Sequence, residues 1–183
     1  MAVKLNSSGG GSVSLDVGST ASNYTLTLPS ASGTIATTAG GTFTNLTVSN
    51  DATIHGVTVG IGAGSDANNT VVGNSALASN SGGAYNNAFG THALNSVVTG
   101  LNNNAFGWYS LWKNTSSYNT AFGHQTLANN TSGASNTAVG DSALVNNTTA
   151  SNNTAVGYQA AYTNTTGAEN TAVGRLALNA NST

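Results

Sequence analysis

Charged residues are nearly absent from this sequence. Three Lys or Arg and five Asp or Glu make up 4% of the 183 residues, and the formal net charge is −2. About a quarter of an average soluble protein is charged. Three basic side chains are too few to neutralise a row of phosphates, so the composition excludes nucleic-acid binding through charge. The surface must therefore be kept in solution by uncharged Asn, Ser and Thr side chains.

Cysteine is absent and proline occurs once. Without cysteine the chain has neither a disulfide framework nor a cysteine-based zinc site. No apolar run approaches the ~20 residues of a membrane helix, so we expect no membrane insertion. The N-terminal stretch MAVKLNSSGGGS lacks the apolar core of a signal peptide, and export by the standard route is not expected.

A five-residue core of the form N-[NT]-[AV]-[VF]-G recurs seven times between residues 69 and 174. The glycines that close the cores are spaced by 17, 17, 16, 17, 17 and 17 residues, and they are Gly73, Gly90, Gly107, Gly123, Gly140, Gly157 and Gly174. A period of 17 is too short for paired-helix repeats. Each unit contains two short strand-like runs separated by turn residues, which predicts a parallel β-solenoid of seven coils. At the usual strand spacing seven coils extend roughly 34 Å.

Alternation within the unit predicts which side chains face inward, because successive strand residues point to opposite faces. We expect the Val or Phe before each glycine to form the core together with the Leu that follows it by four residues. The preceding alanines are then expected to face outward and to pack on partner chains, unless they form an exposed row without a partner. They are Ala88, Ala105, Ala121, Ala138, Ala155 and Ala172.

The asparagine that opens each core lies above its equivalents in the neighbouring coils, which predicts amide ladders along the solenoid. Residues 1–60 differ from the repeats and consist of short alternating runs such as YTLTLP (24–29) and TIHGVTVG (53–60). We expect three segments: an N-terminal β attachment or shaft region (1–60), a junction (61–68) and the solenoid repeat domain (69–183).

The NTAVG cores and the A-L pair that follows them resemble the head repeats of trimeric autotransporter adhesins, over residues 69–178. That resemblance implies a parallel β-roll within a homotrimer. The stretch NYTLTLPSASGTIATT at 23–38 is similar to segments of bacteriophage tail-fibre and other virion-fibre proteins. An autotransporter needs an export signal and a membrane-anchoring barrel, which this chain does not show, so we expect the virion class.

Candidate catalytic and metal sites are weak. The five carboxylates are scattered along the chain, and Asp141 and Glu169 occupy different places in the repeat, so we expect no acid pair for glycoside cleavage. His55, His92 and His124 lack metal-ligand spacing, and the repeat lacks the Asp of calcium-binding β-rolls. We therefore expect no enzyme activity, no cofactor and no metal.

Aromatic residues are concentrated in one coil, where Trp108, Tyr109, Trp112 and Tyr118 fall within eleven residues. Aromatic side chains hold sugar rings or anchor protein contacts, so these four are a possible receptor contact. The alternative is that the two tryptophans fill a trimer interface or compensate for the coil that is one residue short.

A threonine recurs at one offset of the repeat, as it does on the flat faces of ice-binding solenoids. The row contains Thr70, Thr120, Thr137, Thr154 and Thr171, and it is interrupted by Asn87 and Asn104. Because the alternation places this row on the inner face, we expect no ice binding.

The sequence thus predicts an all-β, homotrimeric virion fibre of a tail or other external appendage. It would attach to the virion through its N-terminal region and bind a glycan or protein on the host surface, without catalysis. A fragment of a bacterial cell-surface trimeric adhesin is the alternative.

Overall fold

A computed structural model of the chain describes residues 51–64 and 66–182. The chain divides into two units, residues 1–45 and 46–183, and all described residues belong to the second. The expectations for the N-terminal region before residue 51 therefore lie outside the described residues, and the proposed three-segment division stays a prediction.

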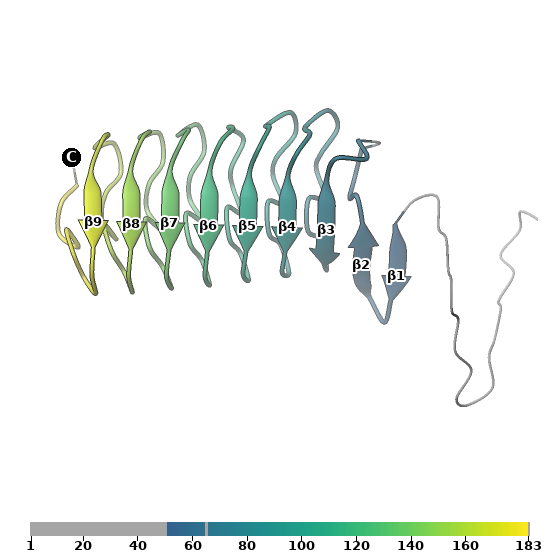
Figure 1. Ribbon diagram of the computed structural model, residues 1–183, viewed down its shortest axis with the longest axis horizontal. Helices are drawn as coiled ribbons and strands as arrows, with labels where there is room; N and C mark the ends of the chain where they lie inside the picture. Colours follow the sequence, from purple (N-terminus) through teal and green to yellow (C-terminus); the bar gives the residue numbers. More distant parts are fainter. Residues whose placement is uncertain (1–50, 65, 183) are drawn as a thin grey trace, which may run out of the picture. The chain divides into compact units, whose positions relative to one another are not determined.

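The described residues form a parallel β-solenoid that begins with a hairpin and contains no helix (Figure 1). Nine strands form one sheet in sequence order. Strands β1 and β2 are antiparallel, β2 is antiparallel to β3, and β3 to β9 are all parallel. Their bounds are β1 (Ala52–Ile54), β2 (Val57–Gly60), β3 (Thr70–Gly73), β4 (Asn87–Phe89), β5 (Asn104–Phe106), β6 (Thr120–Phe122), β7 (Thr137–Val139), β8 (Thr154–Val156) and β9 (Thr171–Val173). The predicted parallel solenoid is confirmed.

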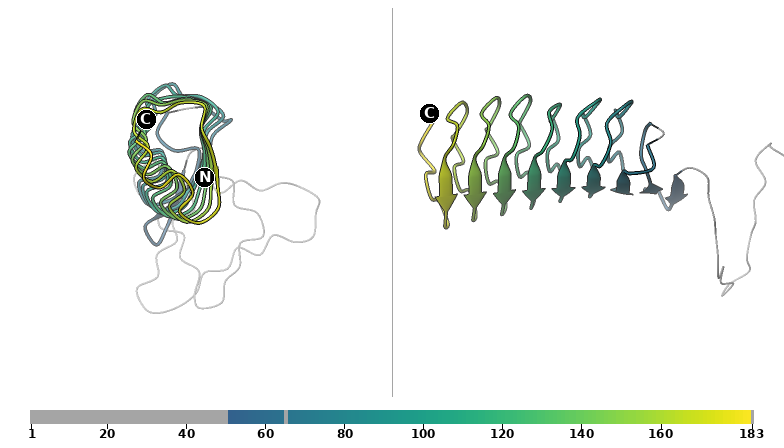
Figure 2. Two further views of the ribbon diagram at one scale, coloured as in Figure 1. Left: turned by 90° about the vertical axis from the view of Figure 1, so that its left-hand side faces the viewer. Right: turned by 45° about the horizontal axis from the view of Figure 1, so that its top comes forward.

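The register repeats from coil to coil, so that equivalent residues stack along the axis. Ala88 pairs with Ala105, and Phe106 pairs with Phe122. The coils superimpose when they are viewed down the solenoid (Figure 2). The run TIHGVTVG is a hairpin rather than one strand, because His55 and Gly56 adopt positive φ and reverse the chain. This hairpin extends the solenoid sheet at its N-terminal end.

Each coil has one strand, not the two that the sequence predicts. The segment after each glycine is a chain of turns in which the second and fourth residues are left-handed, such as Tyr109 (φ 57°) and Leu111 (φ 50°). A left-handed conformation costs a non-glycine residue roughly 1–2 kcal/mol. Neighbouring coils offset this cost through hydrogen bonds from Tyr109 N–H to the Thr91 carbonyl and from Leu111 N–H to the Thr126 carbonyl.

The interior of the solenoid is built from alanine and leucine. The leucine four residues after each glycine is buried in the first five coils, as predicted, at Leu77, Leu94, Leu111, Leu127 and Leu144. The predicted orientation of the strand residues is wrong. The alanines face inward and are 0–2% exposed, and they are Ala88, Ala105, Ala121, Ala138, Ala155 and Ala172. Fully buried within one chain, they are not available as a trimer interface.

The side chains on either side of each alanine face outward. Phe122 is 41% exposed and Val173 is 67% exposed. The physical reason is the width of the coil: leucines from the turn segment already fill most of the interior, so the strand has room only for a small side chain, which is alanine in six coils and Val71 in the first. The sequence specified the alternation correctly but not which of the two phases faces inward.

Two ladders of buried asparagines hold the coils together. The first is the predicted one: Asn103 donates through Nδ2 to Asn86 Oδ1 (3.0 Å) and to the Ser116 carbonyl (2.9 Å), while its own Oδ1 accepts the Asn119 N–H. The second ladder was not predicted and lies seven residues after the glycine, where Asn147 donates to Asn130 Oδ1 (2.9 Å). Such bonds satisfy buried polar groups without charge.

Candidate functional site

Two outward surfaces of the solenoid carry the features that a functional site needs. The first, the strand face, consists of the exposed sides of β3 to β9. One of its rows is Thr70, Asn87, Asn104, Thr120, Thr137, Thr154 and Thr171, and the other is Val72, Phe89, Phe106, Phe122, Val139, Val156 and Val173. Neither row contains a charged residue.

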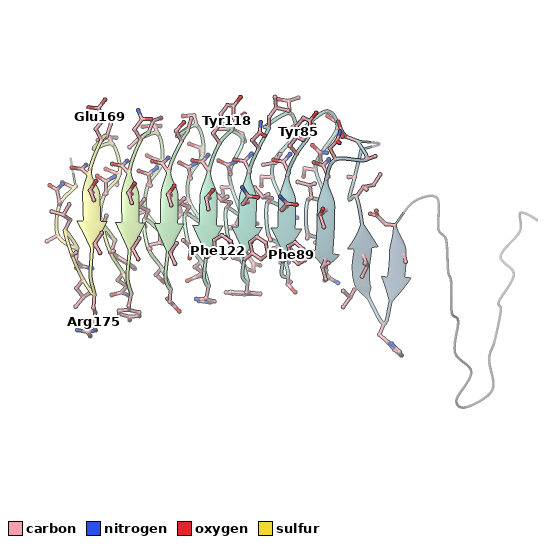
Figure 3. The ribbon with its side chains drawn as sticks, in the orientation of Figure 1. Tyr85, Phe89, Tyr118, Phe122, Glu169 and Arg175 are labelled. Carbon is pink, nitrogen blue, oxygen red and sulfur yellow. The ribbon has the colours of Figure 1, made fainter. Side chains whose placement is uncertain are left out.

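Three stacked phenylalanine rings lie in the middle of the strand face. The Phe89 and Phe106 rings stack with centroids 4.6 Å apart, and the Phe106 and Phe122 rings stack at 4.4 Å. Phe89 and Phe122 lie at the same level of the coils in Figure 3. Because each ring lies against its neighbour in the next coil, the three form one continuous apolar strip along the axis.

The second surface is the aromatic cluster, which we define as His92, Trp108, Tyr109, Trp112 and His124. Trp108 and His124 stack nearly parallel with centroids 5.0 Å apart. Tyr109 contacts Trp108 (4.1 Å), Trp112 (4.9 Å) and His92 (4.8 Å) between ring centroids. Trp108 remains 46% exposed.

The structure brings together three of the four predicted receptor-contact residues. Tyr109 contacts both Trp108 and Trp112, but Tyr118 is not part of the cluster. Tyr118 lies at the same end of the coils as Tyr85, opposite to Arg175 (Figure 3), whereas Trp108 occupies the same place in the repeat as Arg175. The two histidines were not predicted, although the repeat carries a signal for them. His124 and Trp108 each follow their glycine by one residue, and His92 and Tyr109 each follow theirs by two, so in-register stacking brings these rings together.

Charged groups flank the cluster. His124 Nδ1 lies 3.3 Å from Asp141 Oδ2, with both side chains about half exposed. The Lys113 ammonium lies 5.1 Å from the centre of the Trp112 ring. A cation over an indole face is attracted by its quadrupole, so Lys113 is held beside the cluster.

The arrangement of acidic and metal-ligating side chains in the described part of the chain gives little support for a catalytic or metal-binding site. Asp141 shares the place of Arg175 in the repeat, whereas Glu169 lies at the opposite end of the coils (Figure 3). Within residues 51–64 and 66–182 there is no group of three metal-ligating side chains. No described helix is long and apolar enough to span a membrane.

A shallow cavity lies on a third side of the solenoid, where the chain turns back toward the next strand. Its volume is about 410 Å³ and its walls come from four successive coils.

Comparison with protein families, with curated proteins and with solved structures finds no match for this chain. Its function must therefore be argued from its own residues.

Proposed function

We propose that this chain is a structural fibre protein that assembles as a homotrimer, forms part of a phage tail fibre or similar virion appendage, and attaches to the host cell surface without catalysis. The proposal combines the resemblance of the repeats and of residues 23–38 with the character of the strand face. The observation that carries it is the continuous, charge-free strip of outward-facing Phe and Val side chains, which are half-buried at β3 to β5 and exposed from β6 to β9.

The strip supports self-association because isolated soluble chains rarely expose a long contiguous apolar surface. Four of its side chains are 36–67% exposed in the single chain, and they are Phe122, Val139, Val156 and Val173. Copies of this face meet without like-charge repulsion, since neither row is charged. The trimer contact that the sequence assigned to the alanines thus belongs, in this proposal, to the strand face.

The native mass of the purified protein tests the assembly. A trimer has a mass near 54 kDa, three times the 18.0 kDa chain. We expect light scattering to give that mass, and we expect the double variant Phe106→Ser/Phe122→Ser to dissociate while circular dichroism shows a folded solenoid. Tyr118→Ser is the matched control, because Tyr118 is 59% exposed but lies away from the strand face.

A monomer of about 18 kDa for the unaltered protein would overturn the trimer. Dissociation of the Tyr118→Ser control as well would show that the mass does not report on the strand face.

The aromatic cluster is the proposed receptor contact. Trp108 stacks on His124 with one face and is 46% exposed, so the uncovered part of its ring can contact a partner. We expect the variant Trp108→Ala/Trp112→Ala to assemble normally and to bind host cells more weakly. Unchanged binding by intact trimers would assign the cluster to packing alone.

The alternative proposal is a fragment of a trimeric adhesin on a bacterial surface, which the head-like repeats support equally. Immunogold labelling separates the two: antibodies against the solenoid would decorate virion appendages in the first case and cell surfaces in the second.

Ice binding is a second candidate, which the orientation of the threonines favours. Thr70, Thr137 and Thr171 are exposed, contrary to the expectation that they face inward. They stand beside the exposed valines on a regular sheet, which is the hydroxyl-and-methyl pattern of an ice-binding face. Phenylalanines and asparagines interrupt the pattern at β4 and β5, so we expect no thermal hysteresis. A measurable freezing-point gap that Thr137→Lys abolishes would reverse this ranking.

A further inference from the structure

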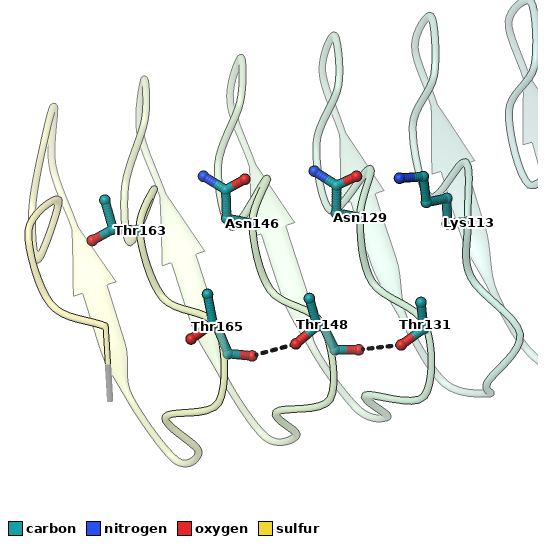
Figure 4. A pocket seen from close by; sticks show the side chains of 7 residues that line it. All are labelled: Lys113, Asn129, Thr131, Asn146, Thr148, Thr163 and Thr165. Carbon is teal, nitrogen blue, oxygen red and sulfur yellow. Dashed lines mark hydrogen bonds between the residues drawn. The ribbon is translucent and has the colours of Figure 1, made fainter.

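The cavity noted above is a trough with a regular lining. We define the trough by its walls: Lys113, Asn129, Asn146 and Thr163 on one side, and Thr131, Thr148 and Thr165 on the other. Figure 4 looks onto these two rows, with the strands behind them. The trough is therefore on a different side of the coil from the strand face, and assembly through the strand face would leave it open.

Backbone groups along the trough are already used between coils. Thr131 N–H donates to the Thr148 carbonyl (2.8 Å), Thr148 N–H to the Thr165 carbonyl (3.0 Å) and Asn129 N–H to the Val145 carbonyl (3.1 Å). An extended peptide binds a sheet by pairing with free backbone groups. The trough offers no such edge, so its binding capacity resides in its side chains.

Those side chains present hydroxyl and amide groups in repeating order. The Thr131 and Thr148 hydroxyls donate to the carbonyls of Thr148 and Thr165 (2.9 and 3.1 Å; Figure 4), and each hydroxyl oxygen keeps lone pairs that can accept a hydrogen bond. The Asn146 amide donates to the Tyr162 carbonyl (3.0 Å), whereas the Asn129 amide makes no side-chain hydrogen bond among the described residues. The hydroxyl protons of Thr163 and Thr165 are likewise donated to backbone carbonyls, so the threonine row offers acceptor oxygens and methyl groups, and Asn129 adds an amide donor. This combination suits the alternating hydroxyl and C–H surface of a sugar chain.

The trough has a charged side chain at one end only. Lys113 is the single charged residue of its lining, and its ammonium lies beside the Trp112 ring. The end of the trough thus adjoins the aromatic cluster, where a cation and an indole stand together. An acidic group on a sugar is the partner that a lone ammonium favours.

We propose that the trough binds an extended glycan and that an acidic group of this glycan contacts Lys113. The inference rests on the proposed attachment to a host surface and names the chemical class of the receptor. The glycan lies along the solenoid axis, with its hydroxyls on the Asn and Thr rows and its carboxylate at the ammonium.

The test uses the full chain, a short oligogalacturonate and the same oligosaccharide with its carboxylates methyl-esterified. Calorimetric titration should detect the acidic chain, with weaker binding of the neutral one. Lys113→Gln should lower affinity for the acidic chain by roughly fivefold, in line with a single exposed ion pair, and leave the ester unchanged. A sulfated galactan oligosaccharide run in parallel shows whether carboxylate or sulfate is preferred.

Asn129→Trp fills the trough at a side chain that has no hydrogen bond to the rest of the described chain, and it should abolish binding of both oligosaccharides. Ser79→Trp is the matched control, since Ser79 occupies the same place in the repeat three coils earlier, outside the trough. Equal binding by both tryptophan variants would overturn the site.

Failure of both acidic oligosaccharides to bind a protein whose mass is that of a trimer would overturn this inference and leave the proposed fibre standing. Binding that an acidic peptide displaces and an oligosaccharide does not would also overturn it.

Discussion

Glycine recurs in this chain because neighbouring coils approach within contact of their backbones. A Cβ on Gly107 would overlap the carbonyl of Gly123 in the next coil, and its φ of 139° lies where side chains are rarely found. The buried asparagines have the complementary role, because they satisfy the backbone groups that this close approach leaves without strand partners. At the residue scale, stability depends on side chains that are small or are fully hydrogen-bonded.

Gly82 and Gly83 provide a matched pair for this argument. A Cβ on Gly83 would overlap the Gly100 carbonyl, whereas a Cβ on Gly82 would meet only a threonine methyl group at 3.8 Å. Neither residue has the positive φ that would strain an alanine. We expect Gly83→Ala to lower the free energy of unfolding by about 2–3 kcal/mol, as overpacking does, and Gly82→Ala to be neutral or slightly stabilising. Chemical denaturation measures both, and similar losses would contradict the steric reading.

At the scale of the element, the coil rather than the strand is the unit of structure. Each of the strands β4 to β9 has only three residues, and it pairs in register with the equivalent strands of adjacent coils. The five-residue core recurs in the sequence because every coil needs the same small and hydrogen-bonding residues at the same positions. This recurrence made the coil recognisable as the unit. The turn segment was mistaken for a second strand because left-handed Tyr109 and Leu111 are not glycines and give no local signal of a positive φ.

Removal of one whole coil should preserve the fold. Deletion of residues 124–140 joins Gly123 to Asp141, and each remaining residue keeps an equivalent neighbour. Since stability in a solenoid is approximately a sum over coils and their interfaces, we expect a folded protein with a lower melting temperature. Circular dichroism monitors the unfolding transition.

Deletion of residues 124–131 is the out-of-register control. It places turn residues where strand residues stack, and we expect loss of the cooperative transition. If both deletions unfold the chain, the coils are not interchangeable units.

At the scale of the molecule, the solenoid is almost free of charge, and its cohesion comes from amide ladders and an Ala-Leu interior. The described residues contain one ion pair, His124 with Asp141, and both partners are about half exposed. Exposed pairs contribute roughly 0–1 kcal/mol. Because the long faces of the solenoid are neutral, copies of the chain can pack against one another without charge repulsion.

The melting temperature should therefore depend little on ionic strength. Between ~0.01 M and ~1 M NaCl the screening length falls from about 30 Å to about 3 Å, yet we expect a change in unfolding free energy below roughly 1 kcal/mol. Differential scanning calorimetry at several salt concentrations checks this. A strong loss of stability at high salt would point to electrostatic contacts that the solenoid does not display.

The sequence by itself determined the parallel solenoid, its period, the buried leucines and the first asparagine ladder, because each follows from stacking identical units. Tertiary structure decided which phase of the strand faces inward, since that depends on how much interior the leucines of the turn leave free. It also decided that Tyr118 stands apart from Trp108, and that His92 and His124 join the aromatic cluster. The repeat places His124 level with Trp108 and His92 level with Tyr109, but whether their rings meet depends on side-chain orientations that only the folded coils determine.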